Sequence, residues 1–455
     1  MAGRENDTSV AATAEPTPTG PAVDLTAAKG GAADADVPPE LLAQSLGQYL
    51  RAWLQRIRSG DSGVLPVLFG IVIVAIVFEI ITPENAYLRP SNLVYIFGLS
   101  TVYMVLATAE IAVLLLGEID LSIGSVALLG GTIAFKLVAQ DPGPAWPWWL
   151  AILVSLLCCG FIGAIQGTLA ARLKIPSFIV TLAGFLLFQG IIIIILGGAD
   201  GTLTVSSLVP NQAVIFNLVQ GVINPTASWV VLAVLVVIAA AVLVSRAAAR
   251  RRAGLAAPPL ALIVIRIVLV AALGAGVVAI CGANLPSGVP EVIPIVVGIV
   301  GFWTLLLMRT QFGRYIYAIG GNPEAARRAG VNLALVRTGA FALCSATAGF
   351  GGILLGSFFY GQYSTNDADP GQLILYSVAA AVIGGTSLFG GRGKPLHGLL
   401  GGLLIGGIAY GVSLLSLGEL STPLEYILPG AVLLIAVLVD VSSRRGARTG
   451  SVARV

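Results

Sequence analysis

The sequence predicts an all-α polytopic membrane protein with about twelve (10–12) transmembrane helices, both termini cytoplasmic and a disordered N-terminal tail. Of its 455 residues, 57% are hydrophobic and only 10% are charged, whereas soluble domains are roughly a quarter charged. The apolar residues fall in runs long enough to cross a bilayer. The basic residues gather in alternate connections between these runs. We therefore expect a multi-pass protein of the cell (cytoplasmic) membrane.

The N-terminal region divides into two parts. Residues 1–40 consist mainly of Ala, Pro, Thr, Gly and Asp, with few large apolar side chains. Such a composition does not bury enough surface to fold, so we predict a disordered cytoplasmic tail. In residues 41–60, Leu, Trp and Ile recur at helical spacing among arginines, which predicts an amphipathic helix at the membrane surface. The alternative is a helix that packs on a neighbouring protein.

The body of the chain, residues 64–440, holds the candidate spans. A hydrocarbon core about 30 Å thick needs roughly 20 helical residues. The twelve candidates are 64–82, 93–117, 119–138, 147–171, 176–196, 228–245, 259–280, 290–308, 338–359, 372–390, 396–417 and 425–440. Several are short or rich in glycine, so we expect one or two broken or re-entrant spans. Residues 441–455 form a basic tail that we place in the cytoplasm.

The distribution of lysine and arginine predicts the topology. With the N-terminus inside, the inner connections hold Arg51, Arg56, Arg58, Arg172, Lys174, Arg246, Arg250, Arg251, Arg252, Arg309, Arg314, Arg327, Arg328, Arg337, Arg392, Lys394, Arg444, Arg445 and Arg448. The outer connections hold little beyond Arg89 and Lys136, and carry acidic residues instead. Because basic connections stay in the cytoplasm, this split predicts an even number of spans. A missed pair of spans would leave both ends inside.

Glycines form two ridges near the C-terminus. Gly398, Gly402 and Gly406 recur at four-residue steps, and Gly407 and Gly411 form a second ridge. Small residues let helix backbones approach closely in lipid, so we predict a tight helix pair. The alternative is that these glycines permit bending during transport, and the sequence does not separate the two.

A short charged segment, 322–337, interrupts the apolar runs on the predicted cytoplasmic side. It has the signals of a short helix: an N-cap, a proline at the first position, an acid that can pair with basic residues three and four positions later, and a glycine stop. These residues are Asn322, Pro323, Glu324, Ala325, Ala326, Arg327, Arg328 and Gly330. Such a helix suits a groove on a soluble partner. The alternative is a solvated connector.

Several motifs resemble a known family. Glu324-Ala325-Ala326, followed by Gly330, resembles the EAA motif of ABC importer permeases. GRYIYAIGGNPEAARRAGVN, AVIGGTSLFGGRGKP, GEIDLSIGSVALLGG and LKIPSFIVTLAGF resemble the ribose/xylose-type monosaccharide permeases. The resemblance covers about residues 64–440. The long middle section, 198–289, adds two spans to the ten expected of ribose-type members and indicates the xylose-type branch.

The resemblance implies a permease subunit of an ATP-driven importer for xylose or a related sugar or sugar alcohol. Segment 322–337 would be its coupling helix. The implied partners are an ABC ATPase with two nucleotide-binding halves, an extracytoplasmic sugar-binding protein, a second copy of the chain and the lipid bilayer. No nucleic acid is expected as a partner.

The sequence itself also indicates that the energy source lies outside this chain. The sequence contains no GxxxxGK[ST] phosphate-binding motif; its nearest match, ending at Gly393-Lys394, has Leu388 for the first glycine and Pro395 for the serine or threonine. We therefore expect no catalytic residue, metal or cofactor on this chain, with ATP and Mg²⁺ on the partner. The alternative is a secondary sugar transporter driven by an ion gradient.

Polar residues near or inside the spans are candidates for the pathway and gate. In GEIDLSIGS, Glu118, Asp120 and Ser122 follow the second span, and Asp120 can cap a helix that begins at Leu121. Carboxylates next to lipid are costly, so they serve a function or are hydrogen-bonded. We predict a structural break and gate, with direct sugar contact as the alternative. Glu110, Gln166 and Gln189 are further pathway candidates, and interhelical hydrogen bonding is the other reading. The four cysteines are expected to be small packing residues.

Overall fold

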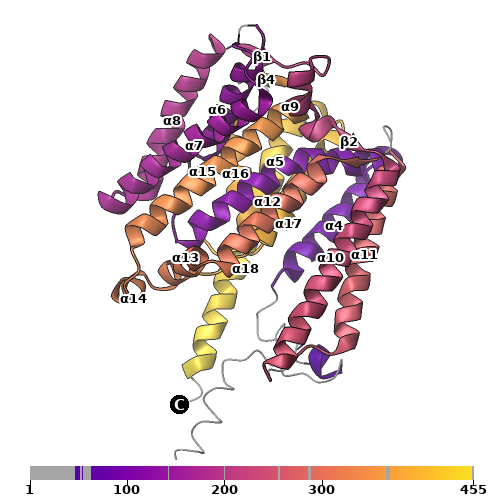
Figure 1. The fold of residues 1–455 in the computed structure, drawn as a ribbon, viewed down its shortest axis with the longest axis vertical. Coiled ribbons are helices and arrows are strands. Elements are labelled where there is room, and N and C mark those ends of the chain that lie inside the picture. The colour runs from indigo at the N-terminus through magenta and orange to yellow at the C-terminus, as the bar shows by residue number, and fades with distance from the viewer. Residues whose placement is uncertain are drawn as a thin grey trace, which may run out of the picture.

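The computed structural model describes residues 47–452, apart from 52–53, 55–62, 142, 199, 255–256, 285–287 and 365–368. The tail predicted at 1–40 lies outside these residues. So does most of the amphipathic helix predicted at 41–60, of which 47–51 and 54 are described and helical. The rest is a bundle of long helices (Figure 1).

Each predicted span overlaps one helix. The helices and strands, in chain order, are α4 (Leu65–Ile81), η1 (Pro83–Asn85), α5 (Pro90–Leu115), α6 (Ile123–Val138), α7 (Trp148–Arg172), α8 (Ser177–Leu196), β1 (Thr202–Thr204), α9 (Pro210–Gln220), β2 (Val222–Ile223), α10 (Pro225–Arg252), α11 (Leu260–Gly282), β3 (Val289–Pro290), α12 (Val292–Arg309), α13 (Gln311–Gly321), α14 (Pro323–Arg328), α15 (Leu333–Phe358), β4 (Gln362–Ser364), α16 (Pro370–Ile383), α17 (Pro395–Leu414), η2 (Gly418–Leu420) and α18 (Ser421–Val452).

The multi-pass helical class is confirmed. In the part of the chain that the structure describes, nine helical segments are long and apolar enough to cross a membrane, while α4, α6 and α16 are apolar but shorter. A count of twelve crossings and the cytoplasmic location of both termini stay predictions.

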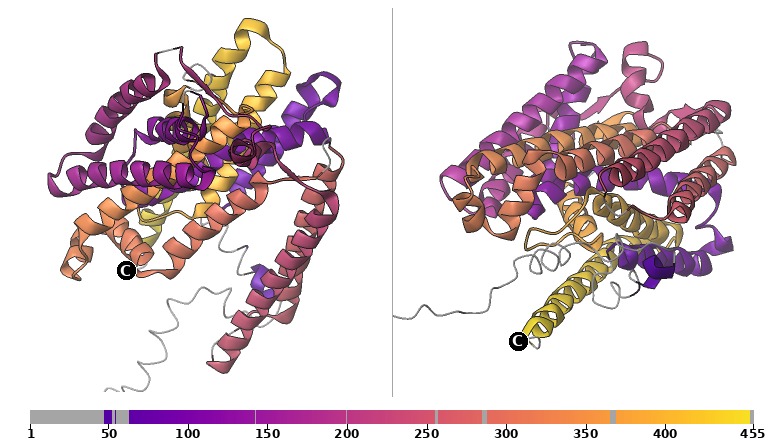
Figure 2. Two further views of the ribbon diagram at one scale, coloured as in Figure 1. Left: turned by 45° about the horizontal axis from the view of Figure 1, so that its top comes forward. Right: turned by 60° about the horizontal axis from the view of Figure 1, so that its bottom comes forward.

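The core lies around three mostly buried helices, α5, α15 and α17. α5 packs against α15, α16 and α17, and α15 packs against α6 and α7. α10 and α11, the two helices of the long middle section, pack mainly on each other and stand beside the rest (Figure 2). Their apolar side chains are largely exposed, as suits helices that face lipid.

The glycine ridges hold α17 tightly against its neighbours. A Cβ atom added at Gly402 would lie 2.5 Å from the backbone nitrogen of Met104 on α5. A Cβ atom at Gly411, on the second ridge, would lie 2.6 Å from the ring of Phe78 on α4. Only glycine permits these approaches, so the predicted tight helix pair is confirmed as α5 and α17.

Two predicted spans are shorter than expected. α6 begins at Ile123, not at 119, because residues 117–122 turn back into the body without forming a helix. α16 ends at Ile383, not at 390, because Gly385 adopts a left-handed φ of +111° and the chain turns toward α17. These non-helical stretches, 117–122 and 384–394, lie beside each other, since a Cβ atom added at Gly390 would lie 3.0 Å from the backbone nitrogen of Gly117. Gly391 N also donates to Leu115 O, at the end of α5, at 2.9 Å.

The two ends of the bundle differ. α14 and the C-terminal ends of α10 and α18 lie toward one face, which we call the α14 face (Figure 1). Two small antiparallel sheets lie toward the opposite, strand face: β1 pairs with β4, and β2 pairs with β3. The arginines in the last turn of α10, and those within α14, thus share one face, as the charge count requires of connections on a single side of a membrane.

Candidate functional site

α14 has the geometry that its sequence predicts. Asn322 Oδ1 accepts a hydrogen bond from Ala325 N at 3.0 Å and caps the helix. Glu324 pairs with both Arg327 and Arg328 on the surface. Ala326 is buried against the body, while the other residues of α14 are exposed.

Gly330 ends the α14 turn in a left-handed conformation, with φ of +82°. Its N–H donates to Arg327 O at 3.0 Å, and Val331 N donates to Ala326 O at 3.1 Å. The helix is therefore closed at both ends by its own residues. It presents charge outward and rests on the body through one alanine.

α13 supports α14 and is tied to the loop 384–394. The phenol of Tyr317 donates a hydrogen bond to Gly393 O at 2.7 Å. Burial raises the pKa of Tyr317 above its ordinary value, so the phenol stays neutral and keeps its donor. Together with the bond from Gly391 to Leu115, this contact joins α13, the loop 384–394 and the end of α5.

Residues 117–122 carry a turn stabilised by Asp120. Asp120 Oδ1 accepts hydrogen bonds from Ser122 N at 2.8 Å and Ser122 Oγ at 2.6 Å. The expectation that Asp120 caps a helix beginning at Leu121 is wrong. The carboxylate closes a turn of its own, which such side chains do readily, and α6 starts at Ile123.

This turn is bonded to three neighbouring helices. Asp120 N donates to Glu110 Oε1 of α5 at 3.1 Å. Gln166 Nε2 of α7 donates to Ser122 Oγ at 3.0 Å. Leu121 N donates to Thr181 Oγ1 of α8 at 3.0 Å. The side chains of Glu110, Asp120, Ser122, Gln166 and Thr181 are buried, so we call these five residues the buried polar network.

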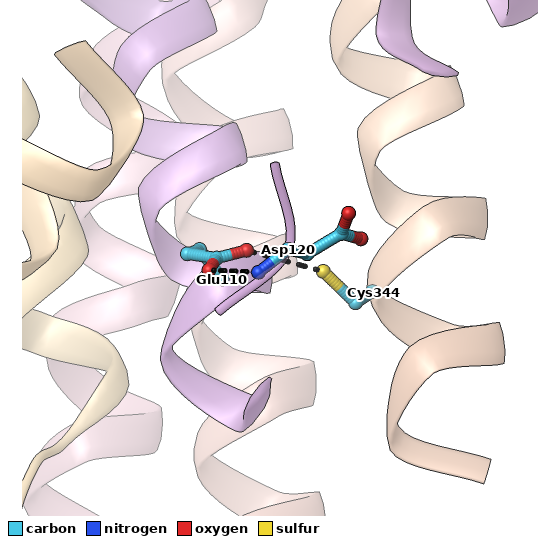
Figure 3. A group of neighbouring side chains, drawn as sticks. All are labelled: Glu110, Asp120 and Cys344. Carbon is cyan, nitrogen blue, oxygen red and sulfur yellow. Dashed lines mark hydrogen bonds between the residues drawn. The ribbon is translucent and has the colours of Figure 1, made fainter. Parts of the chain in front are cut away.

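Cys344 joins the network from α15. Figure 3 shows its sulfur near Glu110 and Asp120, and Sγ donates to Glu110 Oε2 at 3.9 Å. One ligand atom from each of the three residues lies within 4.8 Å of the others. A cation there would have to displace the thiol proton that Glu110 accepts. Glu110 and Cys344 thus bond to each other, whereas Asp120 Oδ2 has no hydrogen-bond partner among the described residues, and we assign no metal to the group.

The structure gathers some of the predicted pathway residues and leaves others apart. Glu110, Asp120, Ser122 and Gln166 meet in the buried polar network. Gln189 lies further along α8, half-buried and outside it. The hydrogen bonds of the network join α5, α7, α8 and the turn 117–122, and the role of these residues in the transport pathway stays a prediction.

Glu118 lies next to this network and pairs with an arginine that the sequence left unassigned. Its Oε1 is 3.4 Å from Arg337 Nε, and both side chains are largely buried, with exposed fractions of 17% and 24%. Arg337 is in the first turns of α15, which follows α14 closely. Thr181, Cys344 and Arg337 were not predicted as site residues. The sequence did hold one signal for the pair with Arg337, because its charge is opposite to that of Glu118 and both residues fall on the same predicted side of the membrane.

Comparison with protein-family models matches residues 92–437 to the family described as the permease component of the branched-chain amino acid transport system. The chain belongs to this family. It is 33% identical to the xylose transport system permease protein XylH of Escherichia coli K12 over 381 residues, which is 83% of this chain and 92% of the relative. The corresponding protein of Haemophilus influenzae is 31% identical over 397 residues, or 86% and 99% of the two chains.

The ribose import permease protein RbsC of Escherichia coli K12 is 26% identical over 394 residues, which is 86% of this chain and 95% of that one. These identities confirm the resemblance to ribose/xylose-type permeases and its xylose-type branch. No solved structure matches the chain.

Proposed function

We propose that this chain is the membrane subunit of an ATP-driven importer of monosaccharides, and that it couples to a separate ATPase through α14. The observation that carries the proposal is the geometry of α14. It is a short, capped helix whose charged side chains face outward, in a chain with few charges. The similarity to XylH and RbsC supports a sugar as the substrate.

The route from α14 into the membrane is short. Four residues separate α14 from α15, and Arg337 in α15 contacts Glu118. Glu118 lies two residues before Asp120, whose backbone N–H is bonded to α5. The next two residues, Leu121 and Ser122, are bonded to α8 and α7. A displacement of α14 would therefore reach α15 and the turn 117–122 together.

The mechanism follows from this route. ATP binding closes the ATPase dimer and draws the α14 helices of two permease copies together. That movement rocks the helices and opens the pathway toward the outside, where a binding protein releases sugar. Hydrolysis resets the permease to face inward. A neutral pentose, hexose or sugar alcohol fits this scheme, with xylose favoured by the relatives.

The test is to substitute Glu324→Lys in the complete importer, purified with its ATPase and binding protein in liposomes. We expect membrane insertion to be unchanged and D-xylose uptake per ATP hydrolysed to fall at least about tenfold, because the helix loses its two ion pairs and its surface for the ATPase becomes wholly basic. Glu84→Lys is the matched control, since Glu84 is also exposed and paired with an arginine. Normal coupling in Glu324→Lys would show that α14 is not the docking element.

The second candidate is a secondary transporter driven by an ion gradient. It predicts that the purified chain alone accumulates D-xylose in liposomes, and that an uncoupler abolishes this uptake. The importer predicts no accumulation without ATPase and ATP. The exposed ion pairs of α14 favour the importer, because a secondary transporter has no partner to bind there.

A further inference from the structure

A cavity of about 240 Å³ opens in the half of the molecule that lies toward the strand face. Its lining comes from α5, α15, α16, α17 and α18, together with residues that flank them. Asp369 and Tyr410 lie at or near the ends of α16 and α17 that are remote from α14. Tyr103 lies 13 residues into α5, which is about 20 Å at 1.5 Å per residue. The cavity thus reaches from the strand face toward the middle of the membrane.

Tyrosine rings form much of the wall. Tyr95 and Tyr410 pack with their ring centroids 4.7 Å apart, and Tyr103 and Tyr376 meet edge to face at 5.3 Å. Tyr103 and Tyr376 are buried, whereas Tyr95 is exposed. Rings of this kind offer flat apolar faces together with hydroxyl groups at their edges.

Besides hydroxyl groups, the cavity contains amide and carboxylate acceptors. Gln372 Nε2 donates to the hydroxyl of Tyr376 at 3.2 Å, so its amide oxygen is the end left to accept. Asp369 and Glu425 add two carboxylates. Tyr426 donates to Asp369 Oδ2, while no hydrogen bond to the Glu425 side chain occurs among the residues that the structure describes.

The charge of the cavity distinguishes between two classes of substrate. Its lining, drawn from the described residues, includes two carboxylates and no lysine, arginine or histidine. The ammonium group of a free amino acid would find these carboxylates, but its own carboxylate would find no cationic partner among the lining residues, at a high cost in a partly buried site. A neutral sugar brings only hydroxyl groups, which donate to carboxylates and amide oxygens, and a carbon face that packs on tyrosine.

The size of the cavity suits a ligand of one sugar ring. Sites for drug-sized molecules have volumes of roughly 300–1,000 Å³, and 240 Å³ falls just below that range. A pentose or hexose suits this volume better than a disaccharide does.

We propose that this cavity is a binding site for one neutral monosaccharide on the outer half of the transport pathway. The ring packs against Tyr103, and its hydroxyl groups donate to Glu425 and Gln372. The proposal rests on the proposed function, because it assumes that the chain transports sugar. It adds the place where the sugar binds and the reason why an amino acid does not.

The first test measures uptake by the complete importer in liposomes, with binding protein, ATP and radiolabelled D-xylose. Glu425→Gln and Gln372→Ala should each lower the uptake rate about tenfold, the change expected when one good hydrogen bond to the ligand is lost. The controls are Ile427→Ala and Leu375→Ala, which change exposed apolar residues on the same helices and should transport normally. Gln372→Ala should also alter the ratio of D-xylose to D-ribose uptake, which a merely structural change would not do.

The second test locates the ligand without relying on transport rates. In a Cys158→Ser background, Gln372→Cys should react with a membrane-impermeant methanethiosulfonate reagent added from outside. Excess D-xylose should slow the reaction at least about fivefold, whereas excess L-leucine should not.

The outcomes separate this proposal from the proposed function. If uptake and selectivity are unchanged in both cavity variants while the importer runs on ATP, the cavity is not the sugar site, and the proposed function is unaffected. Protection by L-leucine in place of D-xylose would overturn the sugar assignment of the cavity. An importer that moves no sugar with ATP would overturn the proposed function itself.

Discussion

The ion pair between Glu118 and Arg337 gives the sharpest test of how α14 connects to the membrane helices. Its two side chains come from the turn 117–122 and from α15, and Glu118 Oε1 lies 3.4 Å from Arg337 Nε. We consider Glu118→Gln, Arg337→Gln, the double variant and the charge reversal Glu118→Arg with Arg337→Glu. If the contact carries force from α14, each single substitution should weaken both stability and coupling.

The magnitude follows from distance and burial. Two unit charges 3.4 Å apart attract by about 5 kcal/mol at an effective dielectric constant of about 20. Desolvation offsets part of this attraction, so exposed pairs contribute at most about 1 kcal/mol, whereas breaking a buried pair costs about 3–5 kcal/mol. With 17% and 24% of the side chains exposed, we expect about 2 kcal/mol for each single substitution, and a coupling free energy of similar size.

The assay is a double-mutant cycle on thermal unfolding in detergent, together with sugar uptake per ATP hydrolysed in liposomes. The charge reversal should recover part of both quantities. The exposed pair Glu84 and Arg89, 3.0 Å apart, is the control and should show a coupling free energy below about 0.5 kcal/mol. If the effects of the Glu118 and Arg337 substitutions simply add, the two residues do not interact and the connection is wrong.

Three further predictions concern packing and hydrogen bonds. Gly402→Val should lower the yield of folded protein, and it should lower the free energy of unfolding by about 3 kcal/mol or more, because α5 leaves no room for a side chain. The control is Gly298→Val, at a glycine with open space, and equal stability of the two variants would contradict the tight packing. Gln166→Leu should cost about 1–3 kcal/mol, because Ser122 keeps Asp120 but loses its partner on α7 inside the body; Gln189→Leu should be close to neutral in the same unfolding measurement. Tyr317→Phe should cost about 1 kcal/mol by removing the bond to the loop 384–394, and an unchanged melting temperature would show that this bond is not stabilising.

Local signals in the sequence were enough to predict much of the fold. Apolar runs of about 20 residues located the helices, because a span must satisfy its own backbone in lipid. The cap and ion pairs of α14 involve residues at most four apart, so sequence spacing alone describes them. The ridge at Gly402 was recognisable because four-residue steps place glycines on one helix face.

The features of the fold and of the sites that the sequence did not predict depend on contacts between distant segments. Nothing near Cys344 in the chain shows that its thiol meets Glu110, which is 234 residues away. The cavity draws Tyr103, Gln372 and Glu425 from three helices whose neighbours are set by packing. Even the early end of α16 depends on the turn at Gly385, which an apolar run of residues does not reveal.

α15 brings the two proposals together, because it touches both the coupling element and the sugar cavity. It runs from Leu333, close after α14, to Phe358, and Leu355 near its far end lines the cavity. Its 26 residues extend about 39 Å, and it is buried against α5, α6 and α7 over most of that length. A packed helix moves as a rigid rod more readily than it bends. A shift imposed on α14 at one face should therefore move the cavity wall at the other, which is what coupling of ATP hydrolysis to sugar release requires.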